Sequence, residues 1–434
     1  MFSLEIATFP VREVELGPTT RLDGDRLVLN SEELLKAVRT DPAICEARIE
    51  IVRPGESARI VHVCDAIEPR VKVRGPGTTY PGVLDSTVEV VGQGLTNRLS
   101  GLAVIESTEV PRSMASGTGA NEEALIDMTG PGALSPYSKT INVVLCLQLA
   151  PGLSHQAYEH TVKQAGFRVA MGLAETTRHL PPVETKTYEL GPVDASLPKV
   201  LYIHQNPTWT ETPVQSVYFY GQPLNQSLPT LVHPNELLDG ALTSLSVGAR
   251  AHCASSWLQV NHPVVHELYE EHGRTLNFLG VLLMRTRWET VEEKKLIANQ
   301  GAKMAQLLGA DGAIVTWWLA GNAFIESMLT VEACEQLGIK TVLMTYEYGG
   351  ADRMEPPVLF FSPAADAVVS TGARDVPIVL PPVRRVVGGD DIAPAPEIPD
   401  ERVPAAGEIR FKNILELYSS VDVFGIDRRR CMIY

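Results

Sequence analysis

A run of alternating strand and helix patterns between residues 277 and 345 constrains the fold more than any other feature. The apolar segments are short enough for buried strands, and a glycine follows each amphipathic helix, which is the usual C-terminal stop. In chain order the run predicts a strand at 277–284, a helix at 290–308, a strand at 312–317, a helix at 323–337 and a strand at 341–345. Units of this length favour a parallel sheet with right-handed crossovers.

The beginning and end of the chain have different patterns. Short β-rich runs separated by Pro-Gly pairs dominate the start, with one short helix predicted at residues 32–39 and Ser31 as its cap. The end is rich in proline and acidic residues, which is typical of a linker or a wrapped arm. We therefore predict an α/β protein with a β-rich N-terminal domain at 1–150, an α/β domain with a parallel, Rossmann-like sheet at 151–388, and a Pro-rich arm and C-terminal segment at 389–434.

Charge and composition narrow the possible partners. The net charge of −15 argues against nucleic acid or an anionic membrane as the main partner, since both require a basic surface. The N-terminus lacks a signal-peptide pattern, and no run of about 18 apolar residues is present. The six cysteines are scattered, with no CxxC pair, which indicates reduced thiols. We expect a cytoplasmic protein.

The loops after the predicted parallel strands are candidates for a substrate site. Ligands in open α/β sheets bind beyond the carboxyl ends of the strands, and there is no Walker A or GxGxxG motif to indicate a nucleotide. Aromatic and polar residues in two of these loops are predicted to contact substrate: Trp317, Trp318, Asn322, Glu347 and Tyr348. The alternative is that these are ordinary connecting loops.

Five of the ten histidines fall between residues 233 and 272. His262 and His266 are four residues apart and would share one face of a helix, and with His233 they could hold zinc or iron. The HExxH signature is absent, because Pro263 follows His262 and a helix is expected to begin there. The alternative is that these are surface and helix-cap histidines.

A thiol beside an imidazole occurs at His252 and Cys253. A histidine can activate a neighbouring cysteine as a nucleophile, so this pair is the candidate catalytic pair. The alternative is that Cys253 is a small buried apolar side chain.

A collinear set of short motifs extends from near residue 50 to past residue 370. In the first half they are Arg53-Pro-Gly-Glu-Ser57, Asp65-Ala-Ile-Glu-Pro-Arg-Val-Lys-Val73, Ile126-Asp-Met-Thr-Gly-Pro-Gly-Ala133, Tyr137-Ser-Lys-Thr140, Pro229-Thr-Leu-Val-His-Pro-Asn-Glu236 and Asp239-Gly-Ala241. In the second half they are Leu276-Asn-Phe-Leu-Gly-Val281, Leu308-Gly-Ala-Asp-Gly312, Gly321-Asn322, Gly338-Ile-Lys-Thr-Val-Leu343 and Ala364-Ala-Asp-Ala-Val-Val-Ser-Thr-Gly372. Together they resemble the component B proprotein of glycine, sarcosine and betaine reductases.

The resemblance implies a cofactor that this sequence does not provide for. In the family a precursor breaks itself at an Asn-Cys bond shortly after the Asp-Gly-Ala element, and the cysteine becomes a pyruvoyl group that binds a substrate amine. The corresponding pair here is Ser246-Val247, and valine has no heteroatom with which to attack the preceding carbonyl. A second family cysteine falls on Ala251. We therefore predict that the pyruvoyl group is absent.

Three kinds of function remain open on this basis. The resemblance implies an oxidoreductase subunit in a hetero-oligomer, acting on a small amine- or amino-acid-like substrate with a partner subunit that carries a thiol or selenol. The alternatives are a non-catalytic relative that scaffolds a partner or binds a small molecule, and a metal-dependent enzyme that uses the histidines between residues 233 and 272.

Overall fold

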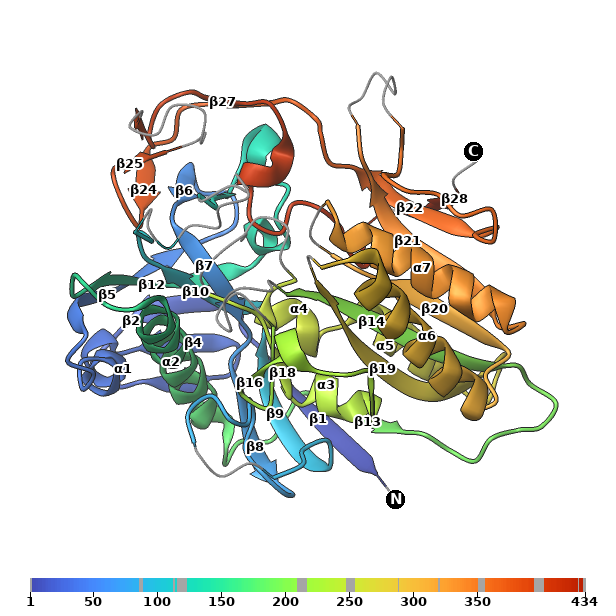
Figure 1. The fold of residues 1–434 in the computed structure, drawn as a ribbon. Helices are drawn as coiled ribbons and strands as arrows, with labels where there is room; N and C mark the ends of the chain where they lie inside the picture. Colours follow the sequence, from blue (N-terminus) through green and yellow to red (C-terminus); the bar gives the residue numbers. More distant parts are fainter. Residues whose placement is uncertain are drawn as a thin grey trace.

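The computed structural model describes residues 2–85, 89–111, 114, 123–208, 217–246, 254–287, 289–318, 321–349, 356–393, 402–427 and 429–431. The chain is a mixed α/β protein, which confirms the predicted fold class (Figure 1). Its strands form two groups, one built mainly from the first third of the chain and one mainly from the second half.

The largest sheet in the described part of the chain has seven strands. Their spatial order is β17 (Thr230–Val232), β19 (Asn277–Arg287), β14 (Lys199–Thr208), β20 (Gly312–Thr316), β21 (Lys340–Glu347), β22 (Val368–Ala373) and β28 (Arg430–Cys431). The five central strands run parallel, and the two edge strands are antiparallel to their neighbours. The parallel sheet predicted from the alternating pattern is therefore present.

Helices cover both faces of this sheet. The crossover helices α6 (Val291–Leu307) and α7 (Ala323–Gln336) lie on one face, while α4 (Ser256–Val260) and α5 (Pro263–Glu271) lie on the other (Figure 1). Successive strand residues point to opposite faces. Accordingly, Gln205 bonds Thr330 of α7, whereas Tyr202 bonds His262 at the start of α5.

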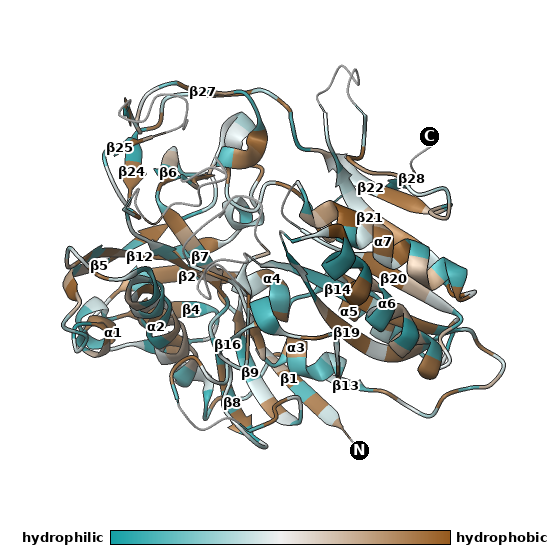
Figure 2. Cartoon of the chain, viewed as in Figure 1, coloured by the Kyte–Doolittle hydropathy of each residue, from teal (hydrophilic) through white to brown (hydrophobic). Residues whose placement is uncertain are grey.

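The helix α6 shows how sequence places a helix on this sheet. Thr290 caps it, and its buried positions recur every three or four residues, as expected for one apolar face. Figure 2 shows hydrophilic and hydrophobic residues side by side on α6. Gly301 allows a close approach, because a Cβ there would lie 2.7 Å from Sδ of Met284 in β19.

The N-terminal region contains two four-stranded sheets. One has the order β13 (Glu184–Glu189), β1 (Ser3–Pro10), β9 (Gly94–Ser100) and β8 (Arg70–Arg74). The other has the order β5 (Ile44–Val52), β12 (Ile141–Leu149), β10 (Leu102–Ser107) and β7 (Val63–Ile67). The helix α2 (His155–Ala174) supplies apolar residues to the core of this region.

The remaining elements are short. Three-stranded sheets join β2 (Glu13–Leu16), β4 (Arg26–Leu29) and β3 (Arg21–Asp23), and also β16 (Gln222–Pro223), β15 (Tyr218–Phe219) and β18 (Leu242–Thr243). The helix α1 covers Ser31–Val38, and Asn30 rather than the predicted Ser31 caps it, with its side chain accepting from two backbone N–H groups. The five-residue helix α3 covers Pro234–Leu238.

The last part of the chain returns to the N-terminal region. The strand β24 (Arg385–Val387) joins β6 (Ala58–Ile60) and β11 (Ile126–Asp127) in one sheet. The pairs β23 (Ile378–Leu380) with β27 (Ile409–Phe411) and β25 (Asp391–Ile392) with β26 (Val403–Pro404) lie beside it, at the upper left of Figure 1. Part of the predicted arm is thus packed in an apolar cluster that includes residues of the first domain.

The division of the chain at residue 150 stays a prediction. Beyond that residue, β13 pairs with β1 and α2 packs on the N-terminal core, so both belong by contact to the first region. No helix in the described ranges is long and apolar enough to cross a membrane.

Candidate functional site

The site is organised around the segment that follows α3. Its Asp239 is fully buried and accepts hydrogen bonds from Gly92 N at 2.7 Å and Thr96 Oγ1 at 2.6 Å, and it pairs with Lys72 of β8. The next residue, Gly240, has a φ of +90°, and a Cβ there would lie 2.7 Å from Cδ1 of Tyr80. The two motifs that contain Lys72 and Asp239 are therefore in direct contact.

Arg70 binds the backbone on both sides of this segment. Its guanidinium donates to the carbonyl oxygens of Leu238 at 2.5 Å and Val260 at 3.2 Å, and pairs with Glu68 at 2.6 Å. Leu238 precedes the segment and Val260 follows it. A single buried side chain therefore fixes both ends of the stretch in which the family resemblance predicts the loss of the pyruvoyl group.

Lys163 of α2 lies against residues 244–246. Its Nζ donates to the carbonyl oxygen of Ser244 and lies 3.8 Å from Oε1 of Glu159, one helical turn earlier. The same Glu159 oxygen accepts from the backbone N–H of Ser246 at 2.8 Å. Both charged side chains are almost completely buried, and this helical turn binds the backbone on both sides of residue 245 through hydrogen bonds to Ser244 and Ser246.

Two further carboxyl groups complete the charged cluster. Asp65 of β7 accepts hydrogen bonds from both the backbone N–H and the hydroxyl of Ser256, whose hydroxyl also accepts from Ser244 N at 2.9 Å. Glu106 of β10 is also fully buried and stands so close to α2 that a Cβ at Gly166 would lie 2.1 Å from its Oε1. We call Asp65, Glu106, Glu159 and Lys163 the carboxyl–lysine cluster.

Burial controls the protonation of this cluster. It raises the pKa of Glu106 well above the ordinary value, and the charge on Asp65 raises that pKa further, while Lys163 opposes the change. Burial also raises the pKa of Asp65, again against the effect of Lys163. Burial therefore favours the protonated, neutral form of Glu106.

A cavity of about 240 Å³ opens beside the cluster. Lys163 and Glu159 form part of its wall, together with His160, Gln164, Tyr218 and Gln222. The Lys163 ammonium lies 5.2 Å from the centre of the Tyr218 ring. The cavity therefore gives a small molecule a route to a buried amine and a buried carboxylate.

The predicted substrate residues at the strand ends occupy a different environment. Trp317 and Trp318 are completely buried, and their indole N–H groups donate to Thr345 Oγ1 at 2.8 Å and Asn206 Oδ1 at 3.3 Å. Tyr348 accepts from Gly321 N at 3.0 Å and stacks under the guanidinium of Arg374 at 4.4 Å. These aromatic rings fill the core beneath the loops, and substrate binding by them stays a prediction.

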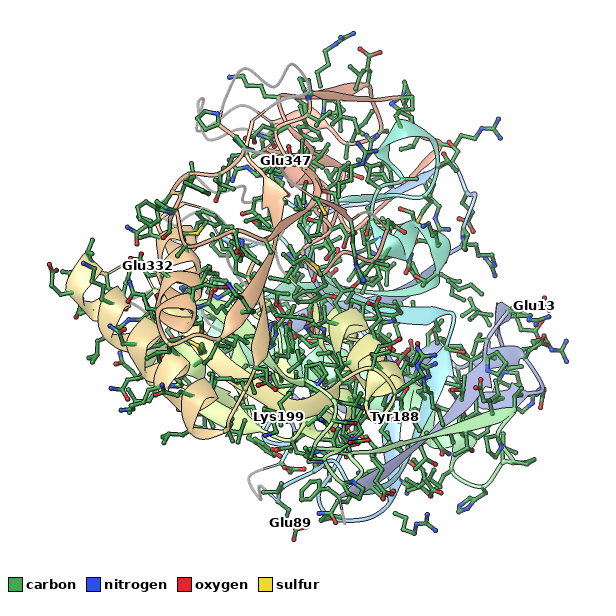
Figure 3. The ribbon with its side chains drawn as sticks, turned by 90° about the vertical axis from the view of Figure 1, so that its right-hand side faces the viewer. Glu13, Glu89, Tyr188, Lys199, Glu332 and Glu347 are labelled. Atoms are coloured by element: carbon green, nitrogen blue, oxygen red, sulfur yellow. The ribbon has the colours of Figure 1, made fainter. Side chains whose placement is uncertain are left out.

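Glu347 and Asn322 lie nearer the surface. Figure 3 shows Glu347 at the carboxyl end of β21, and Lys199, at the start of β14, toward the opposite end of the sheet. Glu347 accepts from the hydroxyl of Ser370. Asn322 precedes α7, and its side chain makes no capping hydrogen bond there. Their role in binding substrate likewise stays a prediction.

A second group of buried charges lies at the carboxyl end of β19. Arg285 and Arg287 pair with Glu289 at 3.1 Å and 2.7 Å, and Lys294 lies 3.7 Å from Glu326. Burial raises the pKa of Glu326 to about 7, although Lys294 opposes the rise. The sequence gives one indication of this group, because Arg285 and Arg287 lie at the end of an otherwise mostly apolar strand.

The three predicted metal ligands each have a separate partner. His233 caps α3 by accepting from Asn235 N at 3.2 Å, His262 shares a 2.9 Å hydrogen bond with the hydroxyl of Tyr202, and His266 shares one of 3.1 Å with Tyr188. Across the described ranges, no three His, Cys, Asp or Glu residues form a group that could hold a metal ion. Zinc or iron binding stays a prediction. The helix does begin at Pro263, as predicted.

Comparison with known proteins identifies the family. A family model described as glycine/sarcosine/betaine reductase component B subunits matches residues 2–396. The chain belongs to this family. It is 36% identical over 392 residues to a protein of Acetoanaerobium sticklandii named "Glycine reductase complex component B subunits alpha and beta", covering 89% of this chain and 88% of the relative.

Two further component B relatives come from Peptoclostridium acidaminophilum. The chain is 34% identical over 403 residues to its "Betaine reductase complex component B subunit alpha", with 89% of this chain and 87% of the relative covered. It is 32% identical over 392 residues to the "Sarcosine reductase complex component B subunit alpha", with 89% of each covered. No solved structure matches the chain.

Some residues important to a component B interpretation lie outside the described ranges. They are the predicted catalytic pair His252 and Cys253, and the positions Val247 and Ala251. Their predicted roles, and the predicted absence of a pyruvoyl group, stay predictions. Ser246 is the last described residue before them, and it sits inside the carboxyl–lysine cluster.

Sequence reasoning missed the carboxyl–lysine cluster itself. Glu159 and Lys163 are four residues apart on a helix, a spacing that is usually read as a solvent-exposed ion pair. A weak signal was present in Glu106, because a carboxylate inside the apolar run at residues 102–107 requires a specific environment. Only the packing of α2 on β7 and β10 brings these side chains together.

Proposed function

We propose that this chain is a subunit of a cytoplasmic, hetero-oligomeric reductase complex of the component B type. It acts on a small amine- or amino-acid-like substrate together with a partner subunit that carries a reactive thiol or selenol, and it has no pyruvoyl group of its own. The family match across residues 2–396 is the observation that carries this proposal. The relatives are named as components of glycine, sarcosine and betaine reductase complexes.

The buried network around Asp239 supports the proposal that the chemistry at this segment differs from that of the family. Arg70 holds Leu238 and Val260, and Lys72 pairs with Asp239, through charged hydrogen bonds that are costly to maintain in a protein interior. The residue after Ser246 is valine, from which no pyruvoyl group can be made. Together, the buried support on either side of this segment and the valine after Ser246 support a component B subunit without a pyruvoyl group.

The test has two measurements on the protein co-expressed with its candidate partner subunit. The denatured mass should show one species near the 47.3 kDa of the full chain, and a hydrazine probe for protein carbonyls should not label it. Amine release from glycine, sarcosine and betaine, with a dithiol as reductant, should require both subunits.

Other outcomes would overturn the proposal in distinct ways. Two fragments, one of them labelled by hydrazine, would mean that a pyruvoyl group forms at a displaced position. Full turnover by this chain alone would refute the need for a partner. Stable binding to the partner with no turnover on any small amine or amino acid would favour a scaffolding role.

A further inference from the structure

The amine of Lys163 occupies an unusual position in the fold. It comes from α2 and reaches the backbone at Ser244, two residues before the serine aligned with the family's cleavage point. The side chain is 8% exposed and forms part of the wall of the 240 Å³ cavity. Among the described lysines, Lys294 and Lys72 are also buried, but neither contributes to the wall of this cavity.

The surroundings of this amine suit nucleophilic chemistry. A lysine held in a desolvated pocket can form a Schiff base with a carbonyl compound. The carboxylate of Glu159 lies 3.8 Å from Nζ, so it is placed to take a proton from the nitrogen as the imine forms. Burial favours the protonated form of Glu106, which can donate a proton when water leaves.

The charge of the cavity indicates the kind of molecule that fits it. Burial favours the neutral form of Glu106, which leaves the carboxyl groups of Asp65 and Glu159 beside one ammonium, so the cluster favours a cationic ligand over an anionic one. The remaining wall includes the amide groups of Gln156, Gln164 and Gln222, which can bond a polar ligand of a few heavy atoms.

We propose that Lys163 forms an imine with a small ketone or aldehyde that also carries an ammonium group. The Nζ lone pair attacks the carbonyl carbon, the new carbon–nitrogen bond forms, and the carbonyl oxygen leaves as water after taking up two protons. Compared with the pyruvoyl chemistry of the family, the protein supplies the amine and the substrate supplies the carbonyl. Because imine formation needs no partner subunit, this inference stands or falls separately from the proposed function.

The probe is aminoacetone, incubated with the full-length protein and then reduced with borohydride to convert the imine into a stable secondary amine. Peptide mapping should find the adduct at Lys163 at least about tenfold above any exposed lysine, with saturation at low probe concentration. Hydroxyacetone, which lacks the ammonium group, should label Lys163 more weakly. The variant Lys163→Arg keeps the positive charge and should abolish the saturable adduct.

The matched control is Lys294→Arg. Lys294 is as buried as Lys163 and also lies near a glutamate, but it does not line the cavity. This variant should be labelled like the wild type at Lys163. If Lys163→Arg does not fold, the peptide map of the wild-type protein tests the proposal by itself, because Lys163 should be labelled and Lys294 should not.

Two results would overturn the proposal. One is labelling spread over exposed lysines and equal in the wild type and Lys163→Arg, which would make Lys163 a structural counterion to Glu159. The other is selective labelling of Lys163 that hydroxyacetone matches at equal concentration, which would refute the charge argument.

Discussion

Replacing Asp239 by asparagine tests the claim that the two motif segments hold each other in place. The substitution keeps the shape of the side chain and removes its charge. Lys72, whose side chain is only 5% exposed, then faces an amide instead of a carboxylate. Asparagine keeps one acceptor oxygen, so only one of the hydrogen bonds from Gly92 N and Thr96 Oγ1 is retained in full.

The expected cost follows from these contacts. Removing one member of a buried ion pair costs about 3–5 kcal/mol, because the remaining charge is left without a counterion. Loss of one further hydrogen bond adds about 1 kcal/mol, and local rearrangement around Lys72 recovers a similar amount. We therefore expect Asp239→Asn to lower the free energy of unfolding by about 4 kcal/mol, a large part of the roughly 5–15 kcal/mol typical of folded proteins.

Urea unfolding followed by both tryptophan fluorescence and far-UV circular dichroism measures this difference. Asp366→Asn is the matched control, since Asp366 is 65% exposed and its contact with Lys340 at 3.8 Å should contribute less than about 1 kcal/mol. Adding Lys72→Met to Asp239→Asn should restore part of the loss, because it removes the unpaired charge. A change below about 1 kcal/mol in Asp239→Asn would refute the structural role of the pair.

Two further predictions concern pH and helix capping. Burial lowers the pKa of His204 to about 4, so the unfolded chain takes up a proton as pH falls below about 6.5 while the folded chain does not. Between pH 7 and pH 5, the free energy of unfolding should therefore fall by about 2 kcal/mol more in the wild type than in His204→Gln. Urea titrations at each pH measure this difference, and the variant His179→Gln, at an exposed histidine, should behave like the wild type. Thr290→Ala should lower the free energy of unfolding by about 1 kcal/mol in urea titrations, because it removes the hydrogen bonds of the Thr290 hydroxyl with the backbone and side chain of Glu293 at the start of α6. Thr290→Ser keeps a hydroxyl group and should lower it much less.

The sequence predicted the elements whose signals are local. The helix starting after Thr290 and the glycine stops at Gly309 and Gly338 follow from backbone chemistry within a few residues, and the structure confirms them. The cap of α1 was wrong by one position, because Asn30 and Ser31 are both good caps and only the fold of the preceding strand decides between them.

The candidate site could not be predicted in the same way. Burial of Lys163 depends on β7 and β10, which are more than fifty residues away in the chain, and no local pattern encodes that packing. Substrate binding by Trp317 and Trp318 was predicted because they follow a predicted strand, and the sequence did not indicate that their indole N–H groups bond to Thr345 and Asn206. Chain position predicts that these residues lie at the carboxyl ends of the strands, but the direction of their side chains is known only from the three-dimensional structure.

The parts of the chain before and after Ser246 each contribute a strand to a sheet of the other part. Residues before this point supply β14 to the interior of the seven-stranded sheet, between β19 and β20 from later in the chain. In return, later residues supply β24 to the three-stranded sheet that contains β6 and β11, and Arg59 of β6 donates to the carbonyl oxygens of Ala405 and Gly407. Each half of the polypeptide adds strands to the other, so strand pairing holds the halves together in addition to the backbone that connects them. Selection could therefore lose or regain a self-cleaving step in such a fold without having to redesign its architecture.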